Sequence, residues 1–133
     1  MTQGPSGAAA LVAELGRRFR AGDIEDAMAL YDPAVRIEQP ASLPHGGWHE
    51  GAAGIGEMGA AFARHWDRTI GPARLLDAGD DAAVQVTTQT WTSKATGRSA
   101  TVDVVELFTV AGGRITEIRV FQQDTHLLLQ TLS

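Results

Sequence analysis

The chain has 133 residues, a length typical of one domain, with 44% hydrophobic and 20% charged residues. This composition is typical of a soluble globular domain, and the absence of cysteine excludes disulfides and thiolate chemistry. The net charge of −5 and the scattered basic residues argue against a nucleic-acid partner. There is no secretory signal pattern and no apolar run of about 18 residues, so we expect a cytoplasmic protein without a membrane partner.

The first half of the chain predicts three helices. After a flexible leader over residues 1–7, a single domain over 8–133 begins with apolar residues at four-residue spacing, which indicates an amphipathic helix to Arg20. A short second helix follows, and its apolar stripe is expected to include Tyr31. A third stripe at helical spacing predicts a helix that ends near Asp67.

The second half of the chain predicts an antiparallel sheet. A short strand precedes a loop rich in proline and glycine, and four segments rich in Val, Thr and Ile follow the third helix. The five predicted strands are 35–38, 73–78, 82–92, 99–110 and 114–122. The connections between the last four have hairpin lengths, so these strands should run antiparallel. The expected class is α+β: a roll in which helices pack on one face of a curved, mainly antiparallel sheet and enclose a cone-shaped cavity.

Two motifs are typical of cofactor or metal sites but lack the required context. Residues 54–59 match Gly-x-Gly-x-x-Gly, yet a dinucleotide site needs a βαβ unit around that motif. His45 and His49 have the spacing of helical metal ligands, but Gly46 and Gly47 between them disfavour a helix. We therefore predict neither a cofactor nor a metal.

Three acidic residues are candidates for chemistry. Asp103 and Glu106 belong to one apolar strand and are three residues apart, so they face opposite sides and one of them must face the interior. A buried carboxyl either pairs with an arginine such as Arg119 or stays protonated and can donate a proton. Glu38, at the end of the early strand, is a candidate general base.

A run of short motifs resembles the ketosteroid isomerase-like and SnoaL-like families of the cystatin-like α+β roll superfamily. The run consists of Gly22-Asp23-Ile24-Glu25, Tyr31 and Glu38-Gln39-Pro40, and the resemblance extends through 51–62, 102–105 and 113–122. It implies that Asp103 takes the place of the protonated oxyanion-hole Asp of ketosteroid isomerases. Gln39 replaces the catalytic base of that family and Leu15 replaces its oxyanion-hole Tyr, so steroid isomerisation is not expected.

The resemblance implies a cofactor-independent cyclase or isomerase that uses acid–base chemistry on an oxygenated, partly hydrophobic small molecule, such as a polyketide intermediate. Asp103 would be the acid, with Glu38 or His65 as the base. The substrate-binding residues are predicted to be Tyr31, Gln39, Phe62, Trp66, Gln89, Trp91 and Gln122. The pattern of the long strand leaves open whether its polar set, which includes Gln89, or its valines face the cavity.

Two other functions stay open at this point. The first is opening of an epoxide, by hydrolysis or polyether-type cyclisation, with Asp103 beside Arg119 or Arg36. The second is a non-catalytic small-ligand-binding module on the same roll. In each case a homodimer is expected, because one face of the sheet has no predicted helix to cover it.

Overall fold

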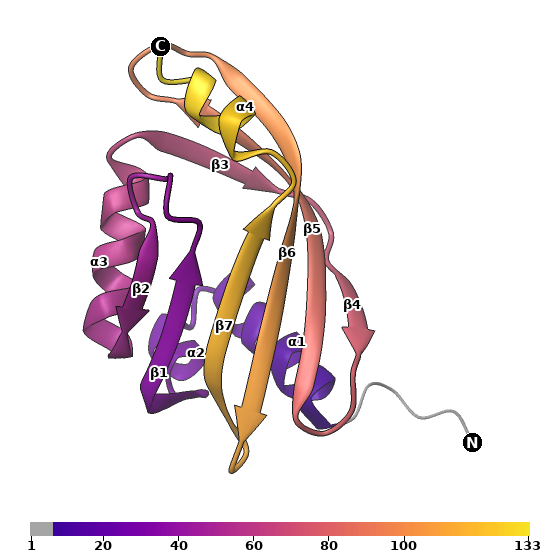
Figure 1. Ribbon diagram of the computed structural model, residues 1–133. Helices are drawn as coiled ribbons and strands as arrows, with labels where there is room; N and C mark the ends of the chain where they lie inside the picture. Colours follow the sequence, from indigo (N-terminus) through magenta and orange to yellow (C-terminus); the bar gives the residue numbers. More distant parts are fainter. Residues whose placement is uncertain (1–6) are drawn as a thin grey trace.

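A single curved sheet forms the frame of the protein, and the computed structural model describes it within residues 7–133 (Figure 1). In this part of the chain the strand order is β2-β1-β7-β6-β5-β3, and β4 also pairs with β5. The strands are β1 (Tyr31–Gln39), β2 (Gly47–Glu50), β3 (Trp66–Ile70), β4 (Arg74–Asp77), β5 (Ala82–Ser93), β6 (Ser99–Ala111) and β7 (Arg114–Gln122). All pairs are antiparallel except β1 with β7, which confirms the predicted mainly antiparallel sheet.

Three helices precede most of the sheet in the chain, as predicted, and a fourth follows it. They are α1 (Gly7–Arg20), α2 (Ile24–Met28), α3 (Gly51–Ala63) and α4 (Thr125–Gln130). Of the expected leader, residues 1–6 lie outside the described residues, and Gly7 already belongs to α1. The sequence did not predict α4, whose six residues are too few for a periodic signal; Asp124 caps it by accepting a 3.0 Å hydrogen bond from the Leu127 amide.

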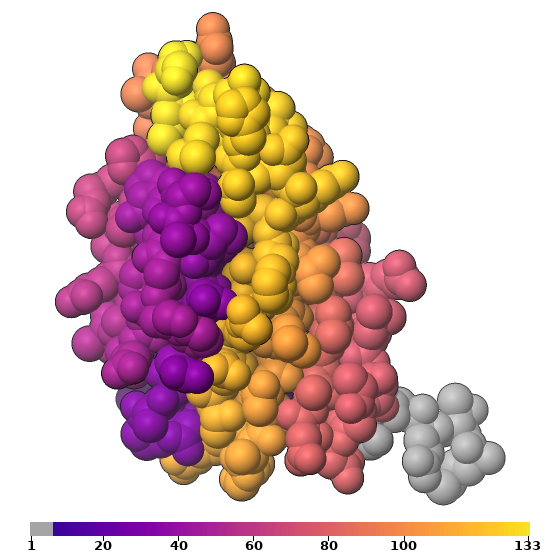
Figure 2. Space-filling view, viewed as in Figure 1, coloured from indigo at the N-terminus to yellow at the C-terminus, as the bar shows by residue number. Residues whose placement is uncertain are grey.

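The helices cover one face of the sheet and leave the other open. Figure 1 shows α1 and α2 behind β7, β6 and β5, while α3 lies beside β1 and β2. Figure 2 shows the opposite face, where side chains of β1, β7 and β6 form a continuous surface. No helix in the described part of the chain is long and apolar enough to span a bilayer.

Two predicted boundaries are wrong. Tyr31 begins β1 instead of ending the second helix, and the register of β1 shifts between Tyr31 and Arg36, around Pro33, which cannot donate a ladder hydrogen bond. The third helix ends at Ala63, and Trp66 begins β3. The four-residue step from Phe62 to Trp66 fits a helix, but pairing of β3 with β5 overrides it.

The core lies between α1 and the sheet and extends under α4. Trp66 anchors its upper part: the side chain is 1% exposed, and its indole Nε1 donates a 2.8 Å hydrogen bond to Thr131 Oγ1. The Thr131 hydroxyl in turn donates to the Leu128 carbonyl at 2.6 Å. This chain of hydrogen bonds ties the start of β3 to the C-terminal segment.

Candidate active site

A cavity of about 1120 Å³ lies between the helices and the covered face of the sheet. Alternate residues of three adjacent strands form one wall of it: Gln85, Thr87, Gln89 and Trp91 of β5; Val104, Glu106 and Phe108 of β6; and Ile118, Val120 and Gln122 of β7. The polar set of β5 therefore faces inward, a point that the sequence pattern left open. The wall combines apolar surface with several hydrogen-bonding groups.

Most of the residues predicted to bind substrate do line this cavity. They are Tyr31, Gln39, Phe62, Gln89, Trp91 and Gln122. Trp66 is different, because it is buried against the rings of Phe62 and Trp91, with ring centroids 5.6 and 5.1 Å away, and supports the wall without lining it. Their role in binding stays a prediction.

Asp103 faces away from the cavity, so the expectation that it is a proton donor inside the cavity is wrong. Its side chain is on the outer face of β6, where its Oδ1 accepts a 2.8 Å hydrogen bond from the Thr88 hydroxyl. Strand alternation decides this, because Val102, Val104 and Glu106 share the inner face.

The two predicted bases also lie outside the cavity. Glu38 points outward and pairs with Arg119 at 2.9 Å, because β1 keeps regular alternation through Gln39. His65 lies in the turn before β3, with its ring 5.7 Å from that of Trp66. With Arg119 bound to Glu38 and Arg36 bound to Glu117 at 2.8 Å, neither arginine forms the epoxide-opening arrangement expected with Asp103.

Glu106 is the acidic residue that lines the cavity. Gln85, its partner across β5 and β6, donates a 3.1 Å hydrogen bond from Nε2 to the Glu106 carboxylate. Burial raises the pKa of Glu106 above its usual value, although the Gln85 hydrogen bond and the Arg68 charge act in the opposite direction. A carboxyl in this state holds and releases a proton nearer to neutral pH, as general acid–base chemistry requires.

Two further groups stand close enough to Glu106 to interact with its charge. Burial, and then the Glu106 charge, raises the pKa of Tyr31, so its hydroxyl stays protonated and able to donate a hydrogen bond. Burial lowers the pKa of Arg68, and Glu106 partly offsets that effect. The Arg68 guanidinium stacks over Phe62, 4.8 Å from the ring centroid. The cavity thus combines a carboxyl with a raised pKa, a hydroxyl that can donate a hydrogen bond and a cation.

His45 supplies a fourth polar group from the turn after β1. The turn needs Gly46, because a Cβ there would come within 2.8 Å of the Leu43 carbonyl oxygen. The His45 ring, 4% exposed, packs edge-on against Phe62 at 5.3 Å, and its Nδ1 has no hydrogen-bond partner among the described residues. Burial, followed by the charge of Arg68, lowers the pKa of His45 to about 4.

The His45→Leu variant is expected to lose less of its free energy of unfolding in mild acid than wild type does. The folded-state pKa of about 4 lies below the ordinary 6.5, so as pH falls the unfolded chain takes up the proton first. The contribution of His45 is present above pH 6.5 and is lost as the pH falls toward 4. Allowing for solvent screening, this effect should lower the free energy of unfolding of wild type by about 2 kcal/mol over that pH range. Urea unfolding of both proteins at pH 4–7 measures this, and parallel pH profiles would contradict it.

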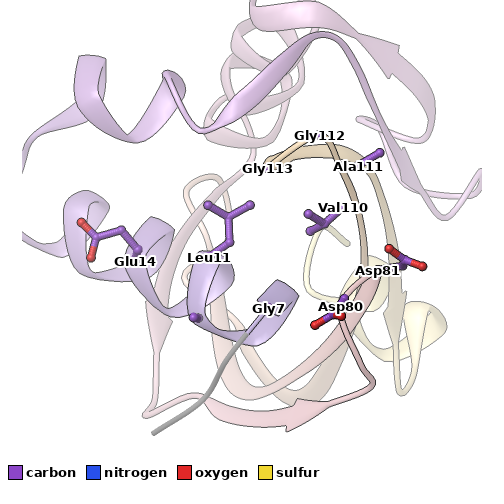
Figure 3. Close-up of a pocket in the computed structure, with 10 residues that line it drawn as sticks. Gly7, Leu11, Glu14, Asp80, Asp81, Val110, Ala111, Gly112 and Gly113 are labelled. Atoms are coloured by element: carbon purple, nitrogen blue, oxygen red, sulfur yellow. The ribbon is translucent and has the colours of Figure 1, made fainter.

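A second pocket, of about 500 Å³, is lined by glycines, aliphatic side chains and carboxylates, with no basic or aromatic side chain from the described residues (Figure 3). Asp80, Asp81 and Glu14 line it beside the glycine turn between β6 and β7. Among residues 7–133, no cluster of three or more His, Cys, Asp or Glu side chains is arranged to hold a metal. The glycine motif over 54–59 lies inside α3, which follows β2 directly, but β2 pairs antiparallel with β1, so the motif does not form the first turn of a parallel βαβ unit.

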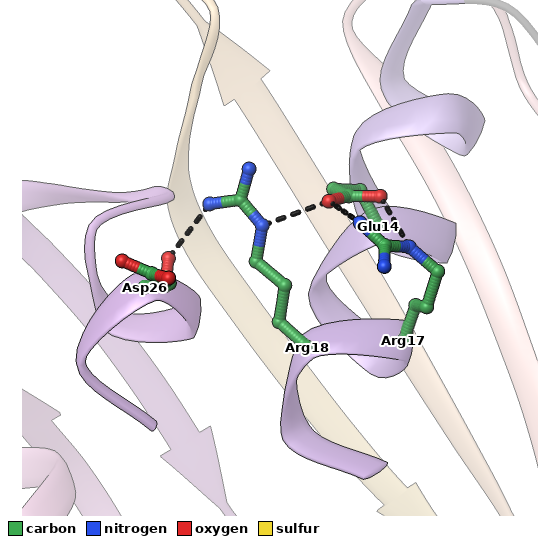
Figure 4. Close-up of polar contacts among 4 residues, drawn as sticks. All are labelled: Glu14, Arg17, Arg18 and Asp26. Carbon is green, nitrogen blue, oxygen red and sulfur yellow. Dashed lines mark hydrogen bonds and ion pairs between the residues drawn. The ribbon is translucent and has the colours of Figure 1, made fainter. Parts of the chain in front are cut away.

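Two of the three arginines of α1 have local partners. Arg17 and Arg18 both pair with Glu14, and Arg18 Nη1 also donates a 2.8 Å hydrogen bond to the Asp26 carbonyl (Figure 4). The hydrogen bonds from Arg17 and then Arg18 lower the pKa of Glu14 to about 2. These contacts connect α1 to α2, which is a structural role for the basic face of α1.

Sequence reasoning missed Arg68 and His45 as cavity residues and left Glu106 undecided. One signal could have placed Glu106: the even-numbered residues of its strand, from Ala100 to Val110, are otherwise all apolar and therefore mark the buried face. Arg68 gave no signal, because residues 66–70 were not recognised as a strand.

Comparison with known proteins supports this fold. A family model of the SnoaL-like domain matches residues 12–118. Among solved structures, an NTF2-like protein from Burkholderia thailandensis E264 is 26% identical, with 96% of this chain and 98% of that chain covered and a TM-score of 0.86. None of the curated proteins matches the chain.

Two other solved structures carry names that bear on function. TerC, co-crystallized with polyporic acid, is 26% identical over 92% of this chain and 95% of that chain, with a TM-score of 0.79. A proposed polyketide cyclase from Pseudomonas putida KT2440 has a TM-score of 0.75 and covers 96% of this chain and 99% of that chain; at 16% identity it is similar in fold alone. Because the family model spans most of the α+β roll, the chain belongs to the SnoaL-like domain family.

Proposed function

We propose that this protein is an acid–base enzyme, a cyclase or isomerase that acts on an oxygenated, partly hydrophobic small molecule in the central cavity without a cofactor. The observation that carries the proposal is Glu106: a carboxyl with a raised pKa on the cavity wall, held by Gln85. It replaces Asp103 as the candidate proton-transferring residue. Tyr31 is placed to donate a hydrogen bond to an oxygen whose charge grows during reaction.

The other polar atoms of the wall favour an oxygenated substrate. Gln122 Oε1 and His45 Nδ1 are buried and have no hydrogen-bond partner among the described residues. An amide oxygen accepts hydrogen bonds, and a neutral imidazole nitrogen either donates or accepts, so both suit hydroxyl groups of a ligand. The similarity to TerC, whose crystals were grown with polyporic acid, and the fold shared with a proposed polyketide cyclase favour the same class of substrate.

The test is product formation from a panel of oxygenated polyketide-type compounds, followed by mass spectrometry with wild-type protein and the Glu106→Gln variant. A product of unchanged mass, or one that has lost water, formed by wild type and not by Glu106→Gln supports the proposal. A product that has gained one water from an epoxide would indicate hydrolysis instead. Tight binding without turnover of any compound would favour the non-catalytic binding module.

We also propose that two copies pair through the open face of the sheet. Phe121 and Trp48 are 46% and 42% exposed there, each beneath an arginine of the same face, Arg119 and Arg36 respectively. A two-fold contact would bury these aromatic side chains in both copies.

Light scattering at micromolar concentration is expected to give about twice the 14.1 kDa of one chain. A Phe121→Glu variant should shift toward the single-chain mass, because it places a charge in the contact, whereas Glu57→Gln on the exposed surface of α3 should not. A wild-type mass near 14.1 kDa would contradict the dimer.

A further inference from the structure

Arg68 is a cation on the cavity wall without an anionic partner. In residues 7–133 the ion-pairing basic side chains are Arg17, Arg18, Arg36, Lys94 and Arg119. Within the described residues Arg68 makes none of these pairs and no side-chain hydrogen bond, although it lines the cavity and is exposed to solvent. Burial lowers the pKa of Arg68 and the charge of Glu106 partly offsets this, but the two side chains form no ion pair, and the Glu106 carboxylate accepts its hydrogen bond from Gln85.

The position of Arg68 is set by two elements. It pairs in register with Trp91 across β3 and β5, which directs both side chains to the inner face of the sheet. Its guanidinium then stacks on Phe62 of α3. Stacking occupies the face of the guanidinium and leaves the N–H groups along its edge to bind an oxygen anion.

Aromatic side chains surround the same part of the cavity. The Phe62 and Trp91 rings meet edge to face, with centroids 4.8 Å apart, and the His45 ring lies 5.8 Å from Trp91. Aromatic walls of this kind favour flat aromatic ligands through stacked and edge-to-face contacts. The cation and the aromatic wall therefore meet at Phe62.

We propose that the cavity selects an aromatic ligand that carries an ionised oxygen, such as a carboxylate, phenolate or enolate, which the edge of the Arg68 guanidinium binds. The inference rests on the proposed function only in taking the central cavity as the substrate site. It narrows the substrate class from oxygenated to acidic and aromatic. Arg68 is then a binding residue, and Glu106 remains the group that moves the proton.

The test compares two probes of the same bicyclic shape, 2-naphthoate and 2-naphthamide, by isothermal titration calorimetry at pH 7.5. Wild type should bind the anion at least about tenfold more tightly than the amide, since charge-assisted hydrogen bonds are about twice as strong as neutral ones. Arg68→Gln should bring the two affinities to within about twofold, whereas Arg68→Lys should keep part of the preference. The control is Arg74→Gln, an exposed arginine on β4 that does not line the cavity and should leave the ratio unchanged.

The Glu106→Gln variant separates this inference from the proposed function. Removing a nearby negative charge should preserve or increase the affinity for naphthoate even though turnover is lost. Equal affinities of wild type for the two probes, an unchanged ratio in folded Arg68→Gln, or no binding of naphthoate at millimolar concentration would each overturn the inference. Loss of turnover in Glu106→Gln together with any of these would leave the acid–base proposal standing.

Discussion

Replacing Glu106 by glutamine is expected to lower kcat by at least about 100-fold, the range seen when a general acid or base is removed. Gln is nearly isosteric with Glu and can still accept the hydrogen bond from Gln85, so the cavity should keep its shape. KM should therefore change by less than about threefold, because the interaction lost is made in the transition state. Steady-state kinetics on the substrate identified by the product screen measures both constants.

The matched control is Asp103→Asn, which removes an acidic group from the same strand. Asp103 lies on the outer face and contacts Thr88, so kcat should stay within about twofold of wild type. The pH profile adds a second readout: wild-type kcat/KM should show a limb above the ordinary 4.5 of a glutamate, and Glu106→Gln should lack it. Equal losses in both variants, or full activity in Glu106→Gln, would rule out Glu106 as the proton-transferring residue.

Replacing Trp66 by alanine is expected to lower the free energy of unfolding by about 3–5 kcal/mol, the usual cost of removing a large buried aromatic side chain. The ring is 1% exposed and packs against Phe62 and Trp91. The substitution also leaves the Thr131 hydroxyl without the indole donor. Urea unfolding at pH 7 gives the difference from the shift in midpoint at constant slope.

Two variants divide this loss into its parts. Trp66→Phe keeps an aromatic ring but no N–H, and should cost about 1–3 kcal/mol through a smaller ring and one lost hydrogen bond. Ile24→Ala removes an apolar side chain of α2 that is 53% exposed and should cost less than about 1 kcal/mol. If Trp66→Ala cost no more than Ile24→Ala, the structural role given to Trp66 would be wrong.

Most of the secondary structure and much of the cavity wall were determined by local sequence. Apolar spacing marked α1, hairpin-length connections marked β5 to β7, and their antiparallel pairing followed from those short connections. Six of the seven predicted binding residues line the cavity; Gln89 and Trp91, for example, share the inner face of β5 because alternate residues of a strand face the same side.

Only the tertiary structure decided that Glu38 lies outside the cavity and that Arg68 lines it. Asp103 and Glu106 lie on opposite faces of β6. The apolar residues that share the face of Glu106 already mark it as the buried one, and α1 packs against that face. Glu38 points away from the cavity because β1, paired with β2 and β7, keeps regular alternation through Gln39; there it pairs with Arg119, which is adjacent in register on β7 but 81 residues away in sequence. Arg68 lines the cavity because residues 66–70 pair with β5. The sequence did not predict this strand, because the helical spacing continues as far as Trp66. The positions of Glu38 and Arg68 depend on contacts between segments far apart in the chain, which local patterns do not encode.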